Sequence, residues 1–232
     1  MTQHHPLDNP VWSSLATTHA HLAEGTGDGR RFPVDVSPFS GVADQGDPRG
    51  WHDLADVAGP GVLLLVPALA VTPPEGFTVT ARLPGVQLVA TDALRTEPSP
   101  HAVELGDQDV DDMLDLVSRT QPGPFGRRTR LLGRYLGIRE DGRLLALAGE
   151  RLHPTGATEI SAVCTDPSAR GRGLATSLVR AVAQGVRDRG ELPFLHAAAH
   201  NTGAIRLYES LGFALRRTLD FATVRTPGTP AP

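Results

Sequence analysis

The sequence predicts a mixed α/β protein in which helices flank a central sheet. After residue 100, segments with a two-residue apolar period alternate with segments of helical period. The pair Asp141-Gly142 joins two of the strand-like segments and is a strong signal for a hairpin turn. Strands that alternate with helices in this way are typical of a mixed α/β order. The 232 residues suffice for one large domain or two small ones.

Residues 1–98 are the less regular part, and we expect an N-terminal α/β half there. Most of the prolines lie in this part, which disfavours long helices. The apolar patterns predict one short helix over 11–22 and strands over 61–66, 77–82 and 86–91. The Pro-containing segment 96–100 predicts a boundary. We therefore divide the chain into residues 1–98 and 99–232.

Residues 99–232 carry clearer patterns. Val110, Met113, Leu114 and Val117 follow the i, i+3, i+4, i+7 rule of an amphipathic helix that Asp107 or Asp109 caps. The other elements predicted are strands over 103–105, 135–140, 143–152, 158–165 and 194–199, a long helix from Leu174, a helix over 204–211, and one or two closing strands over 213–224.

Composition excludes several classes of function. A net charge of −4 with 21% charged residues argues against a disordered tail and against nucleic-acid binding by bulk charge. All 22 basic residues are arginine, and the single cysteine excludes a disulfide framework or a cysteine-based zinc site. No His pair has helical metal-ligand spacing with a third ligand, so we predict no metal.

The first residues also bear on location. Residues 1–6 have neither a basic start nor an apolar run, so we expect no secretory signal. The most apolar stretch, 61–71, is too short to span a bilayer and contains Pro67. We therefore expect a soluble, cytoplasmic protein.

The junction between a strand and a helix at residues 159–176 carries the first chemical signal. Backbone N–H groups at such a helix start have no internal partner and lie at the positive end of the helix dipole. Gly171 and Gly173 allow an anion such as a pyrophosphate to approach the backbone, and Arg170 and Arg172 add positive charge. Taken alone, Arg-Gly-Arg-Gly is equally typical of a flexible turn with surface arginines.

A second segment, Asn201 to Phe213, follows about thirty residues later. The two segments together are more specific than the first one alone. Arg170, Gly173 and Ala175 match the pattern Arg/Gln-x-x-Gly-x-Gly/Ala, and the later segment matches Asn-x-x-Ala-x-x-Leu-Tyr-x-x-x-Gly-Phe. In this order and spacing, the two motifs resemble those of the GNAT superfamily of acetyl-CoA-dependent N-acetyltransferases. The resemblance covers about residues 102–222.

The resemblance implies a fold and a cofactor site. The fold is a central, mostly antiparallel sheet that splays at the cofactor site, and residues 1–98 resemble the extra N-terminal halves, often degenerate copies of the fold, seen in some relatives. Asn201 equally suits a helix N-cap. The implied contacts with acetyl-CoA are Val163, Cys164, Thr165, Arg170, Gly171, Arg172, Gly173, Leu174, Ala175, Thr176 and Asn201.

Two residues resemble catalytic positions. Tyr208 matches the tyrosine that protonates the departing thiolate, or it is a buried core aromatic. Glu159 matches the register of a glutamate general base if burial raises its pKa, or it is a surface carboxylate at a strand end. Glu150 is the reserve base, and His196 and His200 are either relays or partly buried polar residues. For Cys164 itself, a small buried thiol is a better interpretation than an acyl carrier.

The sequence thus predicts an N-acetyltransferase that moves the acetyl group of acetyl-CoA to a primary amine by direct attack in a ternary complex. The alternatives are a non-catalytic acyl-CoA-binding or interaction module, and an acetyltransferase for protein lysines or N-termini. The expected partner is a small-molecule amine or a peptide, without nucleic acid or membrane. Homodimerisation stays open.

Overall fold

A computed structural model describes residues 5–228 of the chain. The expectation of no secretory signal rests partly on residues 1–4, which lie outside the described residues. The helices are α1 Pro10–Ala16, α2 Pro48–Ala58, α3 Val110–Thr120, α4 Leu174–Asp188 and α5 Thr202–Leu211. The strands are β1 Gly29–Arg31, β2 Ser40–Val42, β3 Leu63–Ala68, β4 Thr78–Ala90, β5 Ala102–Glu104, β6 Tyr135–Glu140, β7 Arg143–Glu150, β8 Ala157–Thr165, β9 Leu192–Ala198 and β10 Phe213–Arg225.

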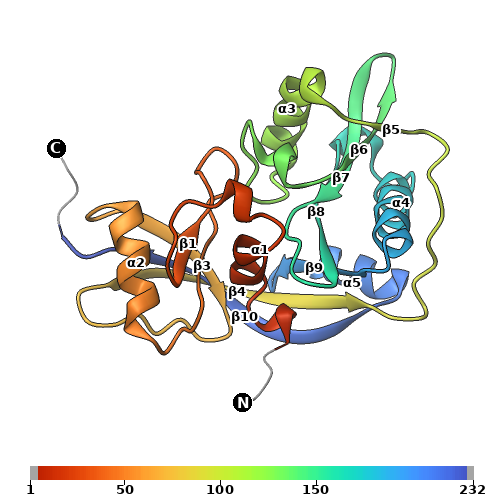
Figure 1. Cartoon of the computed structure of the whole chain (residues 1–232). Helices are drawn as coiled ribbons and strands as arrows, with labels where there is room; N and C mark the ends of the chain where they lie inside the picture. Colours follow the sequence, from red (N-terminus) through yellow and green to blue (C-terminus); the bar gives the residue numbers. More distant parts are fainter. Residues whose placement is uncertain (1–4, 229–232) are drawn as a thin grey trace.

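An eight-stranded sheet runs through the whole molecule in the order β3-β10-β4-β9-β8-β7-β6-β5 (Figure 1). All its neighbouring strands are antiparallel except β8 and β9, which α4 connects as a crossover. The parallel pairing covers only three residue pairs and ends at Glu159 opposite Phe194. Beyond that pair the two strands separate. The predicted class, a mostly antiparallel sheet flanked by helices, is confirmed.

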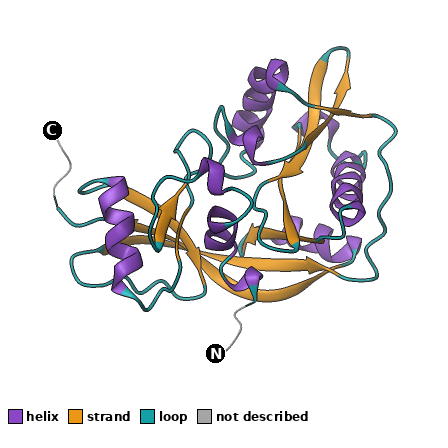
Figure 2. Ribbon diagram, viewed as in Figure 1, coloured by secondary structure: helices purple, strands orange, loops and turns teal. Residues whose placement is uncertain are grey.

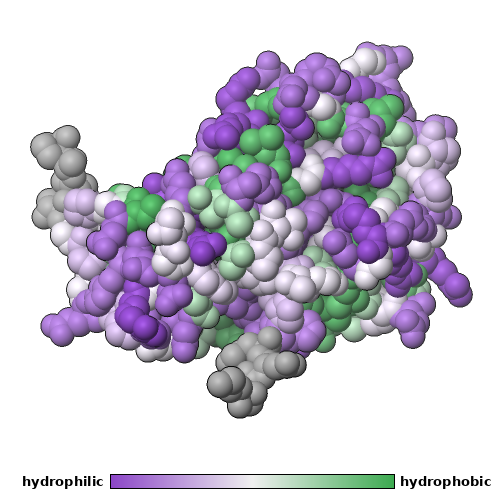
Figure 3. All heavy atoms as spheres, viewed as in Figure 1, coloured by the Kyte–Doolittle hydropathy of each residue, from purple (hydrophilic) through white to green (hydrophobic). Residues whose placement is uncertain are grey.

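Helices cover the sheet on both faces (Figure 2). On one face, α4 and α5 pack against strands β4 and β6 to β9 through apolar side chains such as Leu88, Leu178 and Val182. On the opposite face, α1 packs through Val11 and Leu15 beside Leu65 of β3. At the β3–β10 end, α2 packs through Trp51 and Leu54 against Leu64 and Val66, which point to the other face of β3 from Leu65. The face shown in Figure 3 is mostly hydrophilic, with apolar patches beside the notch between the parts around α2 and α3.

The expected boundary at residue 98 does not separate two sheets. Strand β4 lies between β9 and β10, with Gly85 opposite both Ala198 and Leu219. Strand β3 pairs with the other edge of β10. Residues 1–98 therefore supply two strands, one of them central, to the sheet of the C-terminal part. That they are a degenerate copy of the same fold stays a prediction.

Three local predictions differ from the structure. The first helix ends at Ala16 instead of residue 22, and α2 was not predicted at all, although Asp47 before Pro48 is a helix-start signal. The segments 77–82 and 86–91 form the single strand β4. Pro84 lacks an N–H but does not break the strand, and its carbonyl accepts a hydrogen bond from the Ala199 N–H at 2.8 Å. Residues 213–225 likewise form one strand.

Candidate active site

The loop before α4 exposes a row of free backbone donors. Gly171 and Gly173 have φ of 77° and 76°, in the left-handed region that favours glycine, and a Cβ on either would meet nothing within 4 Å. Within the described residues, no N–H from 171 to 176 has a hydrogen-bond partner. The helix of fifteen residues adds the positive end of its dipole. The loop therefore fits an anionic group such as the pyrophosphate of a coenzyme.

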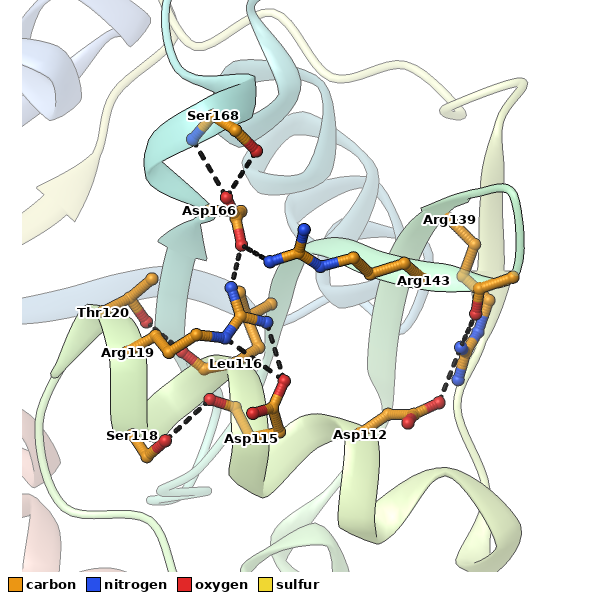
Figure 4. Close-up of polar contacts among 11 residues, drawn as sticks. Asp112, Asp115, Leu116, Ser118, Arg119, Thr120, Arg139, Arg143, Asp166 and Ser168 are labelled. Carbon is orange, nitrogen blue, oxygen red and sulfur yellow. Dashed lines mark hydrogen bonds and ion pairs between the residues drawn. The ribbon is translucent and has the colours of Figure 1, made fainter.

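Charged side chains hold this loop in place. Asp166, at the end of β8, is almost fully buried and accepts hydrogen bonds from the Ser168 N–H at 2.9 Å and from the Ser168 hydroxyl at 2.6 Å (Figure 4). Its other oxygen pairs with Arg119 of α3 and with Arg143 of β7, the latter at 2.8 Å. Asp166 thus ties the start of the loop to two neighbouring elements. Arg172 pairs with Glu140 on the β6–β7 hairpin, whereas Arg170 forms no ion pair with any described residue.

A β-bulge deforms β8 where it separates from β9. Cys164 pairs with Leu147 and Ser161 with Gly149, so Ala162 and Val163 together oppose one residue of β7. Ala162 has φ of 54°, a conformation that costs a non-glycine residue roughly 1–2 kcal/mol. Such strain persists where the surrounding structure imposes it, often at functional sites. The bulge turns the β8 backbone towards the gap between the two strands.

A cavity of about 480 Å³ occupies this gap. At one end it is lined by the β8 bulge and by residues of α5, including Asn201, Ala204 and Tyr208. At the other end its wall comes from distant parts of the chain, including Phe39, Leu65, Leu83 and Phe221. The cavity therefore joins the β8 bulge and α5 to a chamber built largely by residues that precede β5.

Two of the predicted site residues on α5 face this cavity. Tyr208 is mostly buried, and burial raises its pKa to about 12, so the phenol stays protonated at neutral pH. Its hydroxyl has no hydrogen-bond partner within the described residues. The Asn201 side chain accepts a hydrogen bond from the Ala204 N–H at 3.1 Å, which confirms it as the N-cap of α5. Its amide group is left free to donate.

Glu159 does not lie where a direct base would. Its carboxylate is fully buried and binds the Arg151 guanidinium through two hydrogen bonds of 2.8 and 2.6 Å. It also accepts from His196 at 2.8 Å. Burial alone raises the pKa of Glu159, but the charges and hydrogen bonds of Arg151 and His196 outweigh it and lower the pKa to about 2. The net pKa is thus lowered, not raised as the expectation for a direct base required. The alternative of a surface carboxylate is wrong, because the side chain is fully buried.

His196 connects Glu159 to the cavity, whose wall includes His196 but not Glu159. The side-chain amide nitrogen of Gln87 donates to the Leu7 carbonyl at 2.9 Å and approaches His196 Nε2 at 3.1 Å. The amide oxygen accepts from Arg216 at 2.9 Å, which fixes the orientation of the amide. Because an amide nitrogen only donates, Nε2 of His196 carries the lone pair and Nδ1 donates its proton to Glu159.

The remaining predicted residues separate into two groups. Val163 lines the cavity, whereas Thr165 and the buried thiol of Cys164 do not. Burial raises the pKa of Cys164 to about 11, consistent with a structural thiol. Glu150 pairs with Arg189 at 3.0 Å away from the cavity, and His200 is exposed at its edge. No group of three His, Cys, Asp or Glu side chains between residues 5 and 228 is arranged to hold a metal ion.

Sequence analysis missed Arg151, Gln87 and the aromatic wall. Arg151 lies eight residues before Glu159 across a tight connection, which is a signal only once the strand pairing is known. Phe39 and Phe221 stack with ring centroids 6.3 Å apart although 182 positions separate them in the sequence. No local pattern could have joined them.

Comparisons with known proteins agree with this geometry. A family model described as FR47-like protein matches residues 135–222. The crystal structure of a putative acetyltransferase of the GNAT family from Novosphingobium aromaticivorans is 40% identical, with a TM-score of 0.86, and the match covers 97% of this chain and 100% of that one. The chain belongs to the GNAT family of acetyltransferases.

Two further matches are less similar to this chain. A mycothiol acetyltransferase from Thermomonospora curvata is 33% identical over 149 residues, which are 63% of this chain and 47% of that protein. The chain thus spans about half the length of the curated relatives it matches. A GCN5-related N-acetyltransferase from Kribbella flavida shares the fold, with a TM-score of 0.64 at 17% identity over 94% of this chain and 95% of that one. GNAT acetyltransferases use acetyl-CoA. The part of this chain that the structure describes contains no helix long and apolar enough to cross a membrane.

Proposed function

We propose that the protein transfers the acetyl group of acetyl-CoA to a primary amine by direct attack in a ternary complex. One observation carries the proposal. A single cavity reaches the deformed β8 backbone, the free hydroxyl of Tyr208 and the ring of His196. A reaction that needs a bound thioester, a proton donor and a proton acceptor finds all three groups around one space.

In this proposal the residues before and within the start of α4 hold the coenzyme. The N–H groups from Gly171 to Thr176, including those of Arg172, Gly173, Leu174 and Ala175, bind the pyrophosphate, and the unpaired Arg170 adds charge. The backbone of Val163, Cys164 and Thr165 and the free amide of Asn201 bind the pantetheine arm. The strained β8 backbone at Ala162 orients the thioester carbonyl.

The chemistry requires one proton to leave and one to arrive. The amine nitrogen attacks the thioester carbon, so a C–N bond forms and the C–S bond breaks. His196 Nε2 exchanges its hydrogen bond with Gln87 for the proton of the amine, and Glu159 stabilises the resulting imidazolium through Nδ1. Tyr208 donates its proton to sulfur as negative charge develops there. Glu159 is then a positioning residue and His196 the base.

Titration calorimetry with acetyl-CoA tests the cofactor site. We expect saturable micromolar binding by the wild type and none by Gly173→Glu, because the new carboxylate enters the anion site and repels the pyrophosphate. Gly190→Glu is the matched control, since Gly190 also has a positive φ and open surroundings but follows α4. Loss of binding in both variants, or in neither, contradicts the assignment. Binding without turnover on any amine would favour the non-catalytic module.

Tyr208→Phe tests the acid. We expect kcat to fall by about 10²-fold, because the thiolate leaves without a proton donor, while the Kd for acetyl-CoA changes little. Stopped-time assays of free thiol, with the most active amine of a primary-amine panel, measure the rate. Full turnover by Tyr208→Phe would remove Tyr208 from this role and leave it as a core aromatic beside Phe213.

A further inference from the structure

The residues that line the cavity restrict the kind of amine that it can accept. Among the described residues that line it there is no Asp or Glu. Its chamber beyond β8 is walled instead by apolar side chains, among them Phe39, Leu65, Leu83 and Phe221. Two carboxylates lie behind this wall and both are already paired: Glu159 with Arg151 and His196, and Asp220 with Arg82 at 3.1 Å. The cavity therefore offers no anionic partner for a second ammonium group.

Arg151 gives the same chamber a hydrogen-bond donor. Its Nε and Nη2 atoms bind Glu159, and its guanidinium lies 4.7 Å from the ring centroid of Phe39. Nη1 makes no hydrogen bond within the described residues, and it is not among the fully buried atoms that lack a partner. Arg151 lines the cavity and keeps 10% of its side chain exposed. Nη1 is therefore the part of this buried cation that a ligand can reach.

The position of that donor is tied to the proposed base. Arg151 Nη2 and His196 Nδ1 bind the same oxygen of Glu159, at 2.6 and 2.8 Å. The guanidinium and the imidazole therefore lie on either side of one oxygen atom. Because Arg151 and His196 both line the cavity, an amine beside the imidazole and an oxygen beside the guanidinium can belong to one molecule. A guanidinium binds carboxylate and phosphate oxygens best, and it also donates to carbonyl oxygens.

We infer that the acceptor is an α-aminoacyl compound with an apolar side chain: one amine, an adjacent carbonyl or carboxylate oxygen that receives a hydrogen bond from Arg151 Nη1, and an apolar body against Phe39 and Phe221. This inference rests on the proposed function and names the substrate class of that same site. Polyamines and other polycationic acceptors are excluded, because every further ammonium would lose its hydration in a chamber without a carboxylate.

A set of matched amines tests the inference. L-Phenylalaninamide carries the adjacent oxygen, phenethylamine has the same ring without it, and spermidine has several amines and no ring. We expect kcat/KM for L-phenylalaninamide to exceed that for phenethylamine by about tenfold or more, and spermidine to be at least about 100-fold poorer than L-phenylalaninamide. The tripeptide Phe-Gly-Gly distinguishes a peptide acceptor from a small molecule. A kcat/KM equal to that of L-phenylalaninamide indicates a peptide N-terminus, and a much lower value indicates a small molecule.

The amines also differ in intrinsic reactivity. Variants of the protein separate that difference from recognition by Arg151. Arg151→Met with Glu159→Gln removes the donor and leaves no buried charge, and we expect the ratio of kcat/KM values for L-phenylalaninamide and phenethylamine to fall by about tenfold. Glu159→Gln alone keeps Arg151 and should keep the ratio, although both variants lose rate. A ratio unchanged in the double variant, or efficient acetylation of spermidine, overturns the inference while the proposed function stands. Acetyl-CoA binding without acetylation of any of these amines contradicts both.

Discussion

Replacing His196 with Gln is expected to lower kcat/KM for amine acetylation by about 10²-fold or more, with acetyl-CoA binding unchanged. A Gln amide can still donate to Glu159, so the buried carboxylate keeps a partner where His196 bound it at 2.8 Å. It offers no basic nitrogen to the cavity, so the amine must lose its proton to water. Rates measured with L-phenylalaninamide, together with calorimetry on the same preparation, separate a lost base from a damaged cofactor site.

Two further variants sharpen this test. In His196→Ala the imidazole is missing altogether, and we expect added imidazole to restore part of the rate by occupying the space beside Glu159. His200→Gln is the control, because His200 is exposed at the edge of the cavity. We expect its rate within about threefold of the wild type. A nearly normal rate of His196→Gln would mean that water accepts the proton of the amine. His196 would then have only a structural role.

Replacing Arg151 with Met is expected to lower the free energy of unfolding by about 3–5 kcal/mol, because it leaves the Glu159 charge buried without its main partner. The double variant Arg151→Met/Glu159→Gln removes both charges together and should recover most of that loss. Urea denaturation at pH 7 measures the three proteins. Arg127→Met, which removes an exposed ion pair with Asp111, is the control and should leave the midpoint unchanged.

The pH dependence of stability is an independent test of the ion pair between Arg151 and Glu159. In the wild type the pKa of Glu159 is lowered from 4.5 to about 2, so its stabilising contribution is present above pH 4.5 and is lost as the pH falls towards 2. In Arg151→Met the unpaired carboxyl is expected to have a raised pKa, so protonation relieves its burial penalty. The gap in stability between the two proteins should therefore narrow as the pH falls from 7 to 4. A constant gap would mean that the loss comes from packing alone.

The sequence predicted those parts of the site that depend on local chemistry. The strand, the turn at Asp166 and Pro167, and the helix from Leu174 follow one another along the chain, so their patterns could be interpreted without any long-range contact. The same holds for the N-cap at Asn201. The splay of the two strands came from the family resemblance, and the structure has it beyond Glu159.

The sequence did not reveal those parts that depend on pairing across the sheet. The state of Glu159 is set by Arg151 on a neighbouring segment and by His196 on β9, and a carboxylate with such partners behaves oppositely to one that is only buried. Similarly, the division at residue 98 followed proline content, whereas the hydrogen bonds of β4 run to β9 and β10. Burial patterns of single segments contain neither fact.

The place of β4 also affects how the protein is made. Strand β4 is complete at Ala90, but its partners begin only at Leu192 and Phe213, and Thr80 bonds to the Thr223 carbonyl across 143 positions. During translation both edges of β4 stay unpaired until the residues of β9 and β10 have left the ribosome. Such long-range pairing folds slowly and exposes an apolar strand to aggregation. The central sheet can therefore close only after the residues of β9 and β10 have been made, so the order of synthesis leaves β4 without its partners for more than 100 residues.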